Sequence, residues 1–91
     1  MKIDYPIDWN EQEGLERPDK GWLNDVIVTL DNGDTYNLSF YDPVRLSQEL
    51  EDEVEAGNAG VLDKGLMVIP SVTKTHIELA IKQAGRENYF D

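Results

Sequence analysis

Residues 22–41, which read WLNDVIVTLDNGDTYNLSFY, decide the fold class of this 91-residue chain. Asn32-Gly33 stands between two runs rich in β-branched and aromatic residues. Asn-Gly accepts the two positive φ angles that a type I′ hairpin turn requires. We therefore expect a β-hairpin that joins about residues 22–30 to residues 35–41.

The two strands of this hairpin differ in their pattern of apolar residues. The first is apolar on both faces, with Val26 and Val28 on one face and Leu23 and Ile27 on the other, whereas the second is apolar mainly on one. A strand with two apolar faces is typical of a sheet interior, so we expect 22–30 to be central and 35–41 to be an edge. A turn at Asn32-Gly33 pairs Leu30 with Thr35, Val28 with Asn37 and Ile27 with Leu38.

A helix is expected directly after the hairpin, from Asp42-Pro43 to about Ala56. Asp can cap the exposed amides, and proline at the first helical position loses nothing by lacking an N–H. Gly57 is the expected end of the helix. Apolar residues at four-residue spacing predict a buried stripe of Leu46, Leu50 and Val54. Acidic residues occupy the flanks and the outer surface: Glu49, Glu51, Asp52, Glu53 and Glu55.

The last third of the chain predicts a third strand and a second helix. Residues 66–69 form a short apolar run ended by Pro70, as in a buried strand. Thr73 is the expected cap of the helix, Val72 packs on Ile77 in a hydrophobic staple, and Gly85 is the expected end. The inner face of this helix comprises Ile77, Ala80, Ile81 and Ala84.

These elements predict an α+β fold in the order β-β-α-β-α. The simplest crossover places the third strand beside the central one, which gives a three-stranded, mainly antiparallel sheet of order 2-1-3 with both helices packed on it. The second face of the central strand then needs cover, from the N-terminal arm or from another subunit. Residues 1–91 form one domain, with an extended acidic arm and loop over 1–21 and a globular core over 22–91.

The N-terminal arm alternates apolar and mostly polar residues, which is strand periodicity. Pro6 removes a hydrogen-bond donor and restricts such a strand to an edge. Residues 10–21 are polar, contain glycine and proline, and predict a loop.

The charge of the chain is one-sided. Residues 1–56 carry fifteen Asp and Glu against four Lys and Arg, while residues 57–91 carry four of each, so the first part accounts for the whole net charge of −11. Phosphate and anionic lipid contacts need clustered basic residues, so we expect no nucleic-acid or membrane partner. The absence of cysteine excludes disulfides and thiolate ligands, and with no apolar run long enough for a membrane span we expect a cytoplasmic protein.

No catalytic or metal-binding signature stands out. His76 is the single imidazole, and no nucleophile pattern accompanies it. Asp31-Asn32-Gly33-Asp34 lacks the alternating oxygen ligands and the bidentate glutamate of a calcium loop. We therefore expect no enzymatic activity, no metal and no cofactor; an enzyme that uses paired carboxylates is the least favoured alternative.

The acidic surface of the first predicted helix has two interpretations. It is either a solvated surface that maintains solubility or a patch that steers a basic partner. The second favours a non-enzymatic binding protein that captures a basic protein, in concrete form an immunity-like or antitoxin-like inhibitor of a nuclease. Its contacts would come from Glu49, Glu51, Asp52, Glu53 and Glu55, with Trp9 or Tyr41 as an apolar anchor. The alternative is a structural or regulatory subunit that homodimerises through a sheet face or the 35–41 edge.

Overall fold

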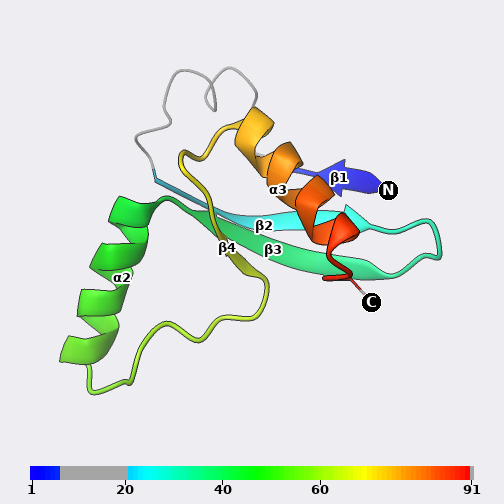
Figure 1. The fold of residues 1–91 in the computed structure, drawn as a ribbon. Coiled ribbons are helices and arrows are strands. Elements are labelled where there is room, and N and C mark those ends of the chain that lie inside the picture. Colours follow the sequence, from blue (N-terminus) through cyan, green and yellow to red (C-terminus); the bar gives the residue numbers. More distant parts are fainter. Residues whose placement is uncertain (7–20, 91) are drawn as a thin grey trace.

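The computed structural model describes residues 1–6 and 21–90. Over these ranges the chain is a small α+β domain, as its sequence predicts, with four strands and two helices (Figure 1). No helix in the described part of the chain is long and apolar enough to cross a membrane. The elements are β1 (Lys2–Asp4), β2 (Trp22–Thr29), β3 (Thr35–Tyr41), α2 (Pro43–Glu55), β4 (Leu66–Val68) and α3 (Lys74–Arg86).

The sheet is mixed and has the order β1-β2-β3-β4. β1 and β3 are antiparallel to β2, and β4 is parallel to β3. The predicted order 2-1-3 is therefore wrong, and the strand at 35–41 is not an edge. The physical reason is that β1 occupies the outer side of β2, with Ile3 opposite Val28, so that the returning chain pairs with the free side of β3.

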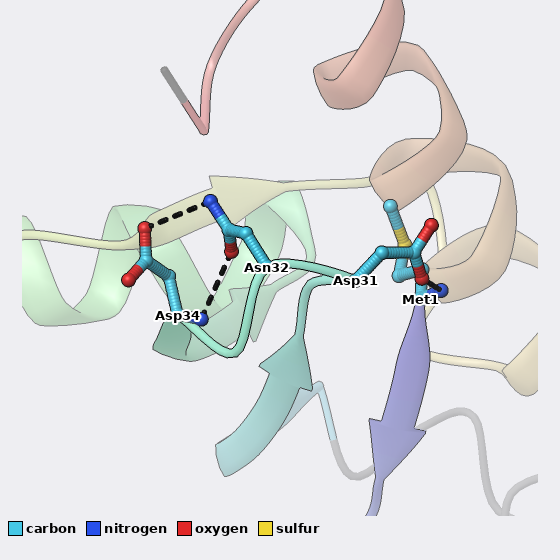
Figure 2. Close-up of polar contacts among 4 residues, drawn as sticks. All are labelled: Met1, Asp31, Asn32 and Asp34. Atoms are coloured by element: carbon cyan, nitrogen blue, oxygen red, sulfur yellow. Dashed lines mark hydrogen bonds and ion pairs between the residues drawn. The ribbon is translucent and has the colours of Figure 1, made fainter.

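The β2–β3 hairpin is confirmed, but its turn differs from the predicted one. Leu30 N donates to Asp34 O at 2.8 Å and Gly33 N to Leu30 O at 2.9 Å, which leaves a three-residue loop. Gly33, at φ +93°, takes the left-handed position of this loop. The Asn32 side chain also stabilises the loop, because its carboxamide Oδ1 accepts a hydrogen bond from Asp34 N at 3.0 Å (Figure 2). The register shifts by one, so that Val28 lies opposite Tyr36.

The same loop holds the start of β1. The α-amino group of Met1 donates to Asp31 Oδ1 at 2.7 Å (Figure 2). This hydrogen bond, and then the positive charge of the amino group, lower the pKa of the Asp31 carboxyl. The contact joins two segments that are far apart in the sequence.

A bulge in β2 changes the side to which Leu23 points. Leu23 pairs with Phe40 but Val26 pairs with Leu38, so that β2 holds one residue more than β3 between these pairs. Asp25 takes the left-handed conformation at φ +62°, and its Oδ1 accepts from Asn37 Nδ2 at 3.1 Å. Leu23 therefore shares the core face with Val26, not the opposite face as predicted.

The core lies between this face of the sheet and α3, which crosses over it (Figure 1). Thr73 caps α3, since its Oγ1 accepts from His76 N at 3.3 Å, and Val72 and Ile77 are both buried. The predicted end at Gly85 is wrong: the helix continues to Arg86, and Asn88 takes the left-handed position at φ +61°. The buried residues are Leu23, Val26, Val28, Leu38, Phe40, Ile69, Val72, Ile77, Ile81, Ala84 and Phe90.

α2 begins and ends as predicted but does not lie along the sheet, which it contacts near its start through Arg45. Asp42 Oδ1 accepts from Arg45 N at 2.7 Å, and Gly57 follows the last turn at φ +92°. None of the thirteen residues of α2 is buried, and the helix extends from one end of the sheet (Figure 1). The predicted buried stripe is wrong, since Leu50 is 45% exposed and Val54 55% exposed.

The second face of the sheet is polar along β3. Thr35, Asn37 and Ser39 lie on this face, opposite to the buried Leu38 and Phe40. A face of this kind along β3 can remain in water. The expected cover concerned the strand at 22–30, and that expectation stays a prediction.

Candidate partner-binding surface

The first two turns of α2 rest on one end of the second sheet face. Trp22 and Tyr41 form a cross-strand pair there, on the side opposite to Leu23 and Phe40. The Arg45 guanidinium lies 5.7 Å from the centre of the Trp22 ring, and its Nη2 is 2.7 Å from Glu49 Oε1. The cation–π contact joins α2 to the sheet, and the ion pair, which lies within α2, holds the guanidinium in this position.

Tyr41 lies close to carboxylates from two segments. Its side chain is half-buried, and burial is the main cause of a raised pKa of the phenol. The negative charges of Glu49 and Asp63 raise this pKa further, and Arg45 opposes them. The predicted apolar anchor is therefore placed beside acidic groups from α2 and from the loop after it.

The titration of Tyr41 tests this arrangement. We expect its phenol to ionise above the usual range and the substitution Glu49→Gln to lower the pKa, because one of the nearby negative charges is removed. Folding raises the pKa of the Tyr41 phenol. The contribution of this phenol to the free energy of unfolding is therefore present below its pKa in the unfolded chain and is lost as the pH rises through its pKa in the folded protein. Ultraviolet absorbance of the phenolate measures the titration, after subtraction of the curve of Tyr41→Phe. An unchanged pKa in Glu49→Gln would contradict the placement.

A hollow of about 260 Å³ separates α2 from the loop that follows it. Glu49 and Glu53 line it from the helix, and residues 58–63 line it from the loop. Asn58 Nδ2 donates to Glu53 Oε2 at 2.7 Å and holds the loop beside the helix. Asp63 adds a third carboxylate, so that the walls of the hollow are acidic.

Exposed apolar side chains lie beside this acidic hollow. Leu62, in its wall, is 86% exposed, and Leu50 and Val54 follow each other by one turn along α2. A Cβ atom at Gly60 would lie 3.7 Å from Leu50 Cδ1, so the loop passes next to Leu50 without covering it. Clustered exposed apolar groups with a polar rim are typical of an interaction surface.

The residues predicted for partner binding divide into two groups. Glu49 and Glu53 lie at the hollow, and each has a partner within the chain. Glu51, Asp52 and Glu55 are exposed on the remaining surface of α2. Trp9 lies outside the described residues. Sequence reasoning missed Asp63 and Leu62, because a loop carries no periodicity that assigns its side chains to a surface.

The described residues show no arrangement typical of a metal site. In residues 1–6 and 21–90, no three Asp, Glu or His side chains come close enough to share a metal ion. The imidazole Nδ1 of His76 lies 2.8 Å from Thr73 Oγ1, so its visible contact belongs to the cap of α3.

Comparison with known proteins finds no protein family, curated protein or solved structure that matches this chain.

Proposed function

We propose that this chain is a non-enzymatic binding protein of the cytoplasm that captures a basic protein through α2. The observation that carries the proposal is that α2 has five acidic residues, one basic residue and no buried residue. A 13-residue helix is marginal in water without tertiary packing, so a helix left uncovered by its own domain gains stability from a partner.

The charges of α2 favour a basic partner. Glu49 and Glu53 are one turn apart, as are Glu51 and Glu55, and such like-charge pairs cost about 0.2–0.5 kcal/mol each. The last turn has no basic residue and its carboxylates oppose the helix dipole. Lysine and arginine from a partner relieve both penalties. A second copy of the chain would instead place two acidic helices together.

The concrete form of the proposal is inhibition of a nuclease. Nucleases hold phosphates with arginine and lysine, and a carboxylate-rich helix can occupy the same groups. Dense charge of one sign also accelerates encounter with such a site and selects against acidic competitors.

Capture at two salt concentrations tests the proposal. The full chain is immobilised and exposed to lysate of its source cell, and retained proteins are identified by mass spectrometry. We expect a basic protein to be retained at low salt and released at high salt, because the exposed charges are screened. The eluted protein should cleave nucleic acid and should be inactive while bound.

Two triple variants with the same change in net charge identify the surface. Glu51→Gln, Asp52→Asn and Glu55→Gln neutralise α2, and Asp4→Asn, Asp34→Asn and Glu87→Gln neutralise exposed acids elsewhere. We expect only the first variant to lose the partner. Equal retention by both, or no retained basic protein, would reject the proposal; an eluted protein without nuclease activity would reject the nuclease form alone.

A further inference from the structure

We infer that the partner presents to α2 an amphipathic helix with an apolar row flanked by lysine or arginine. The inference rests on the proposed function and adds the shape of the partner element. It depends on three properties of the described surface: its apolar row, its charged borders and its backbone.

The apolar row has the length of a short helix contact. Leu46, Leu50 and Val54 follow each other by one turn and so extend over about 12 Å of helix axis. Residues at i, i+4 and i+7 of a second helix form a ridge of similar length, which can pack along this row. Leu50 and Val54 remain about half exposed, and are thus available for such contact.

Carboxylates border the row on both sides. Glu53 lies three residues after Leu50, and Glu51 lies three residues before Val54, which places them on opposite flanks. Glu49 and Asp63 extend the negative border into the hollow beside the loop. A complementary segment therefore needs basic residues on both sides of its apolar residues.

The backbone of α2 favours a helical segment over an extended one. The amide and carbonyl groups along α2 bond to each other, so the helix offers no ladder to an added strand. An extended segment along the row finds no backbone partner in α2, whereas an α-helix satisfies its backbone groups internally. A second copy of α2 carries the same negative charge and is therefore excluded as the occupant.

Synthetic peptides test the inference directly. Three peptides of about 18 residues with the same leucine and lysine content are compared, with leucine at helical spacing, at alternate positions and in random order. We expect the helical-period peptide to bind at least about tenfold more tightly than the others and to gain helical circular dichroism on binding. Fluorescence anisotropy of labelled peptides measures the affinities. Equal affinities, or binding without gain of helix, would overturn the inference.

Matched variants distinguish failure of the inference from failure of the proposed function. Leu50→Ala with Val54→Ala should weaken the helical-period peptide about tenfold, whereas Leu79→Ala, at an exposed site on α3, should not. If all three peptides bind equally, and neutralisation of the α2 carboxylates weakens their binding while Leu50→Ala with Val54→Ala does not, the proposed function stands and the helix inference fails. If neutralisation of α2 also has no effect, both fail.

Discussion

Replacement of Gly65 by alanine is expected to destabilise the protein by about 3–4 kcal/mol, because two costs coincide at this position. Gly65 takes φ +77°, a conformation that L side chains rarely adopt. A Cβ atom there would also lie 2.5 Å from the backbone oxygen of Asn37, which cannot rotate away. Gly65 O accepts from Ser39 N at 2.9 Å, so any shift disturbs the pairing of β4 with β3.

Gly33→Ala is the matched control for this prediction. Gly33 is also left-handed, at φ +93°, but nothing lies within 4 Å of its Cβ position. The free energy of unfolding of Gly33→Ala should fall only by the cost of the left-handed conformation, about 1–2 kcal/mol. Urea denaturation of both variants separates the two costs. Equal losses would show that the close approach at Gly65 relaxes without penalty.

The caps and the hairpin could be predicted from the sequence because each depends on neighbouring residues. Asp42-Pro43 and Thr73 supply the side chains that begin their helices wherever the helix lies. Asn32-Gly33 likewise signals a turn, but both a two-residue and a three-residue loop accept this pair. The structure selects the second, in which Val28 lies opposite Tyr36.

The bulge and the sheet order could not be predicted, because they depend on distant contacts. Asp tolerates the left-handed conformation, but Asp25 alone does not separate a bulge from an ordinary strand position. Leu23 reaches the core face only through this bulge, so simple alternation assigns it to the wrong side. The place of β4 beside β3 depends on β1, which occupies the edge of the sheet next to β2. The pairs between β1 and β2 join residues far apart in the sequence, such as Ile3 and Val28.

The candidate surface shows the same division. Periodicity predicted the row of Leu46, Leu50 and Val54. The same pattern fits a row that packs on its own domain and a row that remains exposed. Only the tertiary arrangement shows that the row is not buried against its own domain. Asp63 and Leu62 reach the surface through a loop that passes beside α2, and local pattern does not reveal the path of such a loop.

Truncation of core and α2 side chains should separate stability from binding. Phe40 is fully buried between the sheet and α3, so Phe40→Ala removes a large side chain from a closed environment. We expect a loss of about 3–5 kcal/mol, a large part of the roughly 5–15 kcal/mol that stabilises a domain of this size. Leu50→Ala should lose less than about 1 kcal/mol, because Leu50 is 45% exposed and alanine favours helices.

The contrast between these two variants bears directly on the role of α2. If Leu50 adds little to the free energy of unfolding, an exposed leucine within an acidic helix has no structural reason in the isolated domain. Leu50 is then available for contact with a partner, as the proposed binding surface requires. Thermal and urea unfolding of both variants supply the measurement. A loss in Leu50→Ala that approaches the loss in Phe40→Ala would instead place the apolar row of α2 in the core and would reject α2 as the partner-binding surface.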